Sequence, residues 1–281
     1  MLSILYGIAS AATWGAGDFA GGLASRKLGA YRAVMYADFF GLLLVGIVFV
    51  FYRESIPSLP VLVTSAIAGA LGSVGLLILY YSLTQGQMSI AAPVSALFAA
   101  VLPVVVGAIS EGLPKPLQFI GFAIALTSVW LISSGNQTER FRLKHLADLR
   151  LPILAGIGFG CYFIFIHYAV QGTAAILWPM IASRIAGTLL LFVVVLFRRE
   201  PFAVARDAWG VVALNATLDL LGNFFYILAS RAGRLDIAAV LSSLYPGSTV
   251  LLAWFFLRER IAPSQWIGIA AALLAIVLFT L

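Results

Sequence analysis

The feature that most constrains this chain is a series of ten long apolar segments, each separated from the next by a polar break. A helix needs about 20 apolar residues to cross a bilayer, so 281 residues leave room for about ten crossings. The segments are continuously apolar and do not alternate, which argues against the strands of a membrane barrel. We therefore predict an all-α membrane protein with ten transmembrane helices, at about residues 2–22, 33–52, 61–83, 90–110, 117–134, 151–170, 174–197, 209–230, 236–257 and 264–281.

The overall composition excludes most soluble proteins. Hydrophobic residues make up 62% of the chain and charged residues 10%, whereas soluble domains contain roughly 45–50% and about 25%. Too few polar side chains remain to cover a water-soluble globule, which excludes a soluble enzyme or a DNA-binding domain. The net charge of +6 is therefore attributed to residues that orient membrane helices, and no nucleic acid partner is expected. The single cysteine, Cys161, can form no intrachain disulfide.

The second half of the chain repeats polar and small residues of the first at a fixed offset of 147. Ser95, Gln118 and Gly121 recur as Ser242, Gln265 and Gly268. Chance similarity between apolar segments is the alternative, but it does not account for glutamine and serine matches at one offset. Five crossings per repeat is an odd number, so the halves would be inverted, with a substrate site between them near mid-membrane. The predicted units are a first repeat (1–134), a polar linker (135–150) and a second repeat (151–281).

Two segments resemble the helices of a known family. Residues 238–278 (AAVLSSLYPGSTVLLAWFFLRERIAPSQWIGIAAALLAIVL) are similar to the last two helices of an EamA domain, and residues 89–112 are similar to the equivalent helix of the first such domain. The pattern from Glu259 to Gly268 is the most specific part. The resemblance covers essentially the whole chain and places it in the drug/metabolite transporter superfamily. It implies an exporter or exchanger of small metabolites, such as amino acids or drugs, which uses neither ATP nor a cofactor and is not an enzyme.

The charged loops indicate an orientation. On the side opposite the N-terminus, the predicted loops contain twelve basic residues: Arg26, Lys27, Arg32, Arg140, Arg142, Lys144, Arg150, Arg198, Arg199, Arg206, Arg258 and Arg260. On the N-terminal side they contain four: Arg53, Lys115, Arg231 and Arg234. By the positive-inside rule both termini face outward, whereas the resemblance implies that both lie in the cytoplasm.

Five ionisable residues fall within the predicted crossings: Asp18, Asp38, His167, Arg184 and Asp219. A charge at this depth costs at least ~2.5–3.5 kcal/mol, and charges that persist there usually line a cavity. Asp18 and His167 are equivalent at an offset of 149. Asp38 and Arg184 are equivalent at an offset of 146. We predict that Asp38 and Arg184 face each other and form an ion pair. The EamA pattern commonly has a basic residue here in both halves, so Asp38 is a departure.

Polar residues also follow the face of one helix. Asn215, Asp219 and Asn223 are spaced at i, i+4 and i+8, with Tyr226 almost one turn further. Trp14 shares a face with Asp18 in the first crossing, and Tyr245 lies in the ninth. These ten residues are the candidate substrate-binding and coupling residues; no catalytic or metal-binding residue is predicted.

Each candidate has a structural alternative. The ion pair could simply hold the halves together, and the two asparagines could join helices by hydrogen bonds worth about 0.6 kcal/mol each. Asp18 could be hydrated near its helix end, and His167 could cap carbonyl groups. Asp219 has no basic residue within a turn of its own helix, so it is the candidate with the weakest structural explanation.

The leading functional hypothesis is a secondary carrier with alternating access, in which Asp219 or Asp18 takes up and releases the coupled proton, with Asp219 preferred. The alternatives are a passive channel or facilitator, which would need a ring of equivalent charges, and a lipid scramblase or membrane enzyme, for which no nucleophile–base spacing is present. The expected partners are a small-molecule substrate, the lipid bilayer and, for coupling, protons. The expected form is a monomer or weak dimer in the plasma (inner) membrane of a prokaryote.

Overall fold

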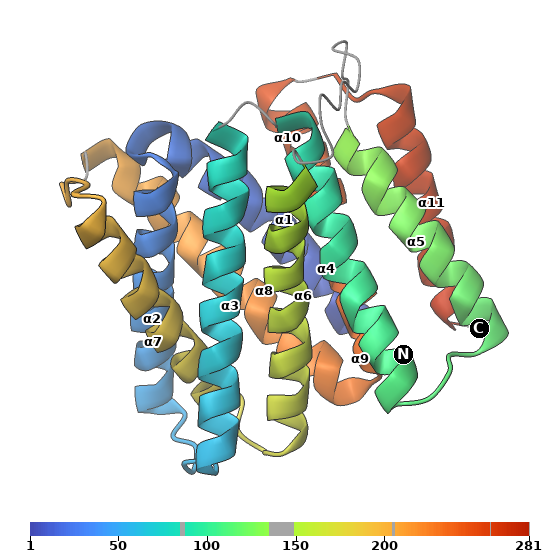
Figure 1. Ribbon diagram of the computed structural model, residues 1–281, viewed down its shortest axis with the longest axis horizontal. Helices are drawn as coiled ribbons and strands as arrows, with labels where there is room; N and C mark the ends of the chain where they lie inside the picture. Colours follow the sequence, from blue (N-terminus) through green and yellow to red (C-terminus); the bar gives the residue numbers. More distant parts are fainter. Residues whose placement is uncertain (85–87, 135–148, 204–205, 259, 281) are drawn as a thin grey trace.

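The computed structural model describes residues 1–84, 88–134, 149–203, 206–258 and 260–280, and their regular structure is entirely helical (Figure 1). The helices are α1 (Leu2–Leu28), α2 (Ala30–Phe51), α3 (Leu59–Thr84), α4 (Met88–Ser110), α5 (Pro116–Ser134), α6 (Arg150–Gln171), α7 (Leu177–Phe197), the short 3-10 helix η2 (Arg206–Ala208), α8 (Trp209–Ala232), α9 (Leu235–Ser242), α10 (Tyr245–Leu257) and α11 (Pro263–Thr280). The predicted linker at 135–150 lies outside the described residues, except for its last two positions.

The ninth predicted crossing (236–257) is not one helix, which corrects the prediction. It is divided into α9 and α10 by a turn at Ser243 and Leu244. Pro246 follows this turn; proline has no N–H to donate and its ring clashes with the carbonyl four residues before it, so it removes one bond from the α-helical ladder. The N–H of Leu244 instead bonds to Leu241 O at 3.2 Å, and that of Gly247 to Leu244 O at 3.0 Å.

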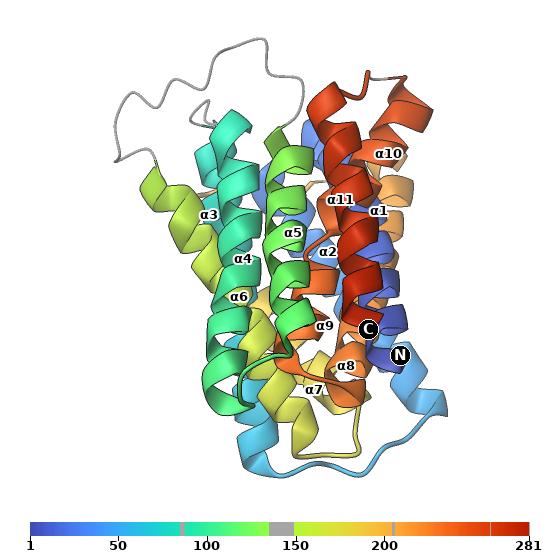
Figure 2. The same cartoon turned by 90° about the vertical axis from the view of Figure 1, so that its right-hand side faces the viewer.

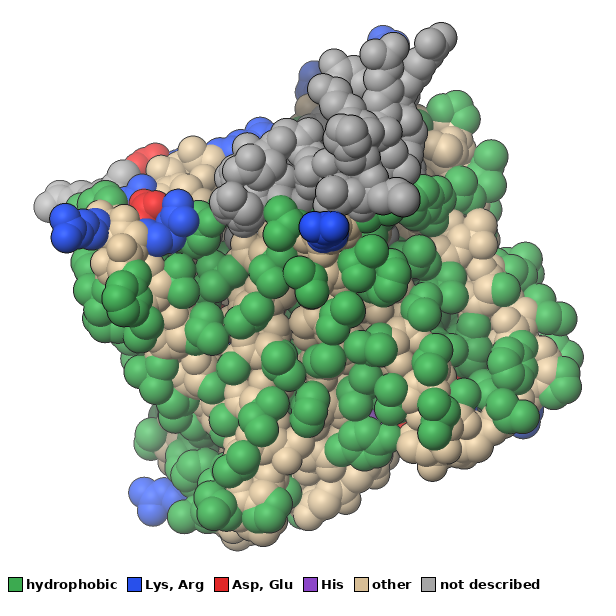
Figure 3. Space-filling view, in the orientation of Figure 1, with side chains coloured by type: hydrophobic (Ala, Val, Ile, Leu, Met, Phe, Trp, Pro, Cys, Tyr) green, Lys and Arg blue, Asp and Glu red, His purple; other side chains and the backbone are tan. Residues whose placement is uncertain are grey.

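Seven described helical stretches are long and apolar enough to cross a membrane: 30–51, 59–79, 150–171, 177–197, 209–232, 235–257 and 263–280. Two shorter apolar stretches cover 94–110 and 116–132. Large apolar side chains lie on the outer surface, among them Ile109, which is 82% exposed, and Phe197, which is 85% exposed. An apolar surface of this extent requires a lipid or protein environment. Figure 3 shows apolar side chains covering the flank of the bundle, with most of the visible lysines and arginines at its upper end.

The helices pack in pairs taken from the two halves of the chain. α1 packs along α8, α3 along α6, α2 along α7 and α5 along α11. The α2–α7 pair lies at one edge of the bundle and the α5–α11 pair at the other, with the remaining helices between them (Figures 1 and 2). α1 begins and α11 ends at the same end of the bundle, opposite the end at which α1 passes into α2. We call these the terminal end and the opposite end.

Glycines allow the central helices to approach closely. A Cβ atom at Gly158 of α6 would lie 2.8 Å from the Cα of Gly75 in α3. A Cβ atom at Gly69 of α3 would lie 2.1 Å from the carbonyl oxygen of Ser183 in α7. Small residues at such crossings let membrane helices gain packing contacts and position side chains accurately.

Candidate functional site

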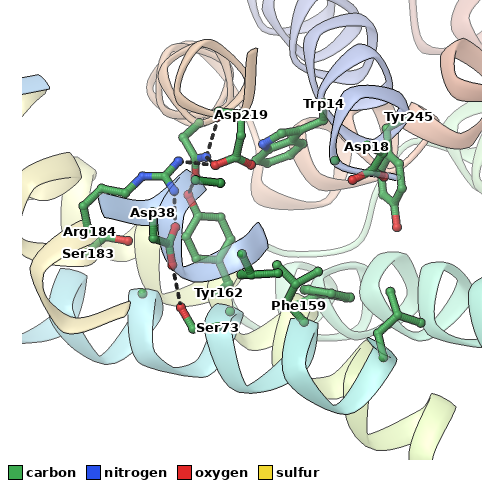
Figure 4. A pocket seen from close by; sticks show the side chains of 18 of the residues that line it. Trp14, Asp18, Asp38, Ser73, Phe159, Tyr162, Ser183, Arg184, Asp219 and Tyr245 are labelled. Carbon is green, nitrogen blue, oxygen red and sulfur yellow. Dashed lines mark hydrogen bonds and ion pairs between the residues drawn. The ribbon is translucent and has the colours of Figure 1, made fainter. Parts of the chain in front are cut away.

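A cavity of about 180 Å³ lies at mid-depth between α1, α2, α3, α4, α6, α7, α8 and α10 (Figure 4). Its lining includes Gly21, Val34 and Leu79, which lie toward the opposite end of their helices. The cavity therefore extends from the middle of the bundle toward the end that carries most of the basic residues. Eight of the ten predicted site residues line it: Trp14, Asp18, Asp38, Arg184, Asn215, Asp219, Asn223 and Tyr245.

Arg184 is at the centre of a charged network on one side of this cavity. Its two terminal nitrogens donate separately, one to Asp38 Oδ1 and the other to Asp219 Oδ2. The predicted Asp38–Arg184 ion pair is therefore present. Asp219 has no basic residue within a turn of its own helix, as the sequence shows, but α7 brings Arg184 to it in space. One guanidinium thus serves two carboxylates, and a planar fork of donors is well suited to this arrangement.

Three further side chains complete the network. Ser73 Oγ donates to Asp38 Oδ2 at 3.3 Å. Asn223 Nδ2 donates to the backbone oxygen of Asp219 at 2.7 Å and to its carboxylate at 3.4 Å, and Asn223 Oδ1 accepts from Tyr162 Oη. The network therefore joins α3, α2, α7, α8 and α6, and every charged group in it is hydrogen-bonded.

Asp18 differs from the other carboxylates of the cavity. It lies on α1 one turn after Trp14, is exposed within the cavity lining, and has no ion-pair partner among the residues that the structure describes. Figure 4 shows it beside Tyr245, on the side of the cavity away from Arg184 and Asp38. Its charge is consequently available to a solute or to water.

An aromatic cluster forms the floor of the cavity. The ring of Trp14 lies 5.5 Å from that of Phe163, 5.8 Å from that of Tyr226 and 6.4 Å from that of Tyr162. Tyr226 is fully buried below these rings and donates to the backbone oxygen of Phe163 at 2.7 Å. Tyr226 therefore supports the floor and does not line the cavity. The sequence could not separate these roles because its spacing places Tyr226 on the same face of α8 as Asp219 and Asn223.

His167 also lies outside the cavity lining, nearer the terminal end. Its Nε2 is 2.8 Å from Glu111 Oε1, and it is 2% exposed. The Glu111 carboxylate also accepts from the N–H of Leu235, with the shorter distance 3.1 Å, and so caps the start of α9. The equivalence of His167 with Asp18 in sequence therefore does not bring both to one site. We call His167, Glu111 and Leu235 the terminal-end latch.

A second carboxylate closes the same end. Glu54 accepts from the N–H groups of Ile176 and Leu177, at 3.0 and 2.8 Å, at the start of α7. Both acidic groups lie where the helix dipole is positive, which stabilises them. Neither glutamate was singled out from the sequence, since both occur in short polar breaks that read as solvent-exposed loops.

Of the network residues, Ser73 and Tyr162 were also missed. Ser73 follows Asp38 by 35 positions, and Asp219 follows Arg184 by the same 35. The offset of 146 that aligns Asp38 with Arg184 could therefore have identified Ser73 as the counterpart of Asp219. Tyr162 lies in an aromatic run (CYFIFIHY), where nothing in the sequence separates a network hydroxyl from a packing residue.

Comparison with known proteins gives three findings. Residues 1–134 and 149–281 each match the EamA-like transporter family. An uncharacterized protein of Methanocaldococcus jannaschii is 28% identical over 131 residues, which are 47% of this chain and 94% of that protein. A solved crystal structure of a protein has a TM-score of 0.81 to this chain at 15% identity, covering 99% of this chain and 96% of the other, which shows a shared fold. Matched along both halves, the chain belongs to the EamA-like transporter family and is an integral membrane protein.

Proposed function

We propose that the chain is a secondary active transporter that exports or exchanges a small metabolite by alternating access. The observation that carries this proposal is the charged cavity at mid-depth, built by residues from both halves of the chain. Charged groups persist at such a depth where they line a solute pathway. The family consists of transporters and not of enzymes, which agrees with this reading.

We further propose ten crossings in two inverted five-helix repeats, with α9 and α10 together forming the ninth. The helix pairs support this arrangement. If α6 is the counterpart of α1 and α8 that of α3, then the α1–α8 and α6–α3 contacts are equivalent. The network has the same symmetry, because Asp38 with Ser73 corresponds to Arg184 with Asp219. Transporters with this architecture commonly bind substrate at the repeat interface.

Alternating access requires the terminal end to open while the opposite end closes. The aromatic floor, the terminal-end latch and the Glu54 cap lie between the cavity and the terminal end. The turn between α9 and α10 lies beside the cavity at Tyr245, and α9 carries Leu235 of the latch. Bending at this turn would move the latch without moving α10, which makes it a natural hinge.

We propose antiport in which substrate and a proton compete for Asp18. Asp219 was the group preferred from the sequence, but it is paired with Arg184 and held by Asn223. Protonating Asp219 would break an ion pair, whereas Asp18 has no ion pair among the described residues to lose. We place the protein in the plasma membrane of a prokaryote, as expected from the sequence; one relative comes from Methanocaldococcus jannaschii, which supports this placement.

Counterflow in proteoliposomes tests the proposed function. Vesicles are loaded with a high concentration of one unlabelled solute from a panel of amino acids, aryl amines, nucleosides and sugars, and the same solute is added outside as a trace label. A carrier exchanges label for unlabelled solute, so we expect transient accumulation of at least one label above its external concentration. Equilibration without such an overshoot would indicate a channel or facilitator, and no protein-dependent flux at all would remove the proposal.

We expect Glu111→Gln to loosen the terminal end. The substitution weakens both the contact with His167 and the cap of α9, and loss of such a cap costs about 0.5–2 kcal/mol. The measurement is the maleimide labelling rate of Val170→Cys, which is 1% exposed, in a Cys161→Ser background. Labelling should be several-fold faster with Glu111→Gln.

The matched control is Glu200→Gln, which removes the same charge beside Arg32 and Arg198 at the opposite end. It should leave the labelling of Val170→Cys unchanged. Equal rates for Glu111→Gln and Glu200→Gln would show that the terminal-end latch does not hold this end closed.

A further inference from the structure

We infer that the transported solute is a small organic cation, a protonated amine with an aryl body, whose ammonium group binds Asp18. The inference rests on the proposed transport function and adds its substrate class. It is carried by the charge of the cavity, the position of Asp18 and the kind of side chains around it.

The charge of the cavity favours a cation. Its described lining contains three carboxylates, Asp18, Asp38 and Asp219, and one guanidinium, Arg184. Arg184 donates to both Asp38 and Asp219 and forms no ion pair with Asp18 among the described residues. A bound ammonium would balance a carboxylate that is otherwise uncompensated at membrane depth. An anionic solute would add to the excess of negative charge instead.

The packing of α1 directs Asp18 into the cavity. Gly17 and Gly21 face α8, because a Cβ atom at Gly17 would lie 3.4 Å from Asp219 N and one at Gly21 would lie 3.2 Å from the Asn215 amide. Gly15 faces α10, where its carbonyl accepts from Thr249 Oγ1 at 3.0 Å. On an α-helix, position 18 lies between these two faces. The carboxylate therefore points into the space between α8 and α10, which the cavity occupies.

The remaining walls suit an aryl body. Trp14, Phe159, Tyr162 and Tyr245 line the cavity together with Asp18. The face of an aromatic ring attracts a cation and stacks on another ring, so this surface can bind both parts of an aryl amine. A phosphate or sulfate would require several free basic groups, and the described lining offers only Arg184, which is engaged. At about 180 Å³ the cavity is smaller than typical drug-sized pockets, which favours a compact solute.

Isothermal titration of the purified protein in lipid nanodiscs with four compounds of similar shape tests the inference. They are phenethylamine (cation), 2-phenylethanol (neutral), 3-phenylpropionate (anion) and phenylalanine (zwitterion), all at pH 7. Phenethylamine should bind at least about tenfold more tightly than 2-phenylethanol, as expected for a charge-assisted contact in a partly dehydrated site. Asp18→Asn should remove most of this preference while changing the affinity for 2-phenylethanol by less than about twofold. Unchanged binding of the neutral compound shows that the variant is folded.

Asp207→Asn is the charge-matched control. Asp207 is at the opposite end, 2.6 Å from Lys27, with a side chain 70% exposed. Its hydrogen bond with Lys27 lowers the pKa of Asp207, so Asp207 is ionised at pH 7 and Asp207→Asn removes one negative charge far from the cavity. Asp207→Asn should retain the full preference for the amine. If it lowers the preference as much as Asp18→Asn does, long-range charge explains the effect and the assignment of Asp18 is wrong.

The remaining outcomes are also decisive. Equal affinity for the amine and the alcohol, tighter binding of the anion or the zwitterion, or no binding of the amine would overturn the inference. Asp18→Asn with the amine preference intact would overturn it too. Failure of the transport proposal is distinguishable, because counterflow of another solute class would leave the transporter in place without this substrate. Asp18-dependent amine binding without any counterflow would leave the site in place without transport.

Discussion

Replacement of Arg184 by glutamine should be the most damaging single change in the cavity. Arg184 is 7% exposed and is the shared partner of Asp38 and Asp219. Without it, two carboxylates face each other at membrane depth with no cation between them. Removing one partner of a buried ion pair costs about 3–5 kcal/mol, so we expect a marked loss of thermal stability in detergent and loss of counterflow. Differential scanning fluorimetry and the proteoliposome assay measure the two effects.

Second-site variants test whether charge balance is the cause. Asp38→Asn alone should be milder than Arg184→Gln, because Arg184 keeps Asp219 as a partner. Combining Asp38→Asn with Arg184→Gln should recover part of the lost stability, since one uncompensated carboxylate remains instead of two. Arg198→Gln, at an exposed site, is the control and should have little effect. A double variant no more stable than Arg184→Gln would show that the guanidinium matters for packing and not for charge.

This expectation differs from the one that the sequence supports. Repeat equivalence alone pairs Asp38 with Arg184 and predicts that losing either partner is severe. The second carboxylate changes the result, because it makes Arg184 indispensable and Asp38 replaceable. Helical spacing relates residues of one helix only, so it could not bring Asp219 to α7.

The helices were predictable because hydrocarbon thickness sets the length of an apolar segment. The division of the ninth crossing into α9 and α10 was harder to predict. Pro103 occurs within α4 without dividing it, and Pro246 differs in following a turn that is already tightened at Leu244. Whether a proline bends or interrupts a membrane helix depends on whether neighbouring groups satisfy the freed backbone, and tertiary packing decides that.

The sequence indicated which residues would matter for the site better than it indicated which of them lie together in the structure. Charge at membrane depth correctly marked Asp18, Asp38, Arg184 and Asp219 as lining residues. It marked His167 equally, yet the structure places that imidazole at the terminal-end latch. A charge within an apolar segment does not show which groups of other helices the fold brings to it, so cavity and latch groups look alike in the sequence.

A second large effect is expected at Gly69, far from any charge in the sequence. A Cβ atom there would lie 2.1 Å from the backbone oxygen of Ser183, the residue before Arg184. Gly69→Ala must therefore push α7 away from α3 and separate Arg184 from the network that Ser73 and Asp38 complete. Overpacking of this kind costs about 1–3 kcal/mol, which thermal unfolding in detergent measures. Because the network depends on this spacing, counterflow should fall at least about tenfold even where the protein remains folded.

Gly46→Ala in α2 is the matched control, since a Cβ atom there would meet no other atom within 4 Å. With no clash, alanine lowers the conformational freedom of the unfolded chain, and stability should stay the same or rise by up to about 1 kcal/mol. Transport should be unchanged, because Gly46 does not line the cavity. If Gly69→Ala behaves like Gly46→Ala in both assays, α3 and α7 can separate freely. The close approach at Ser183 would then not position Arg184.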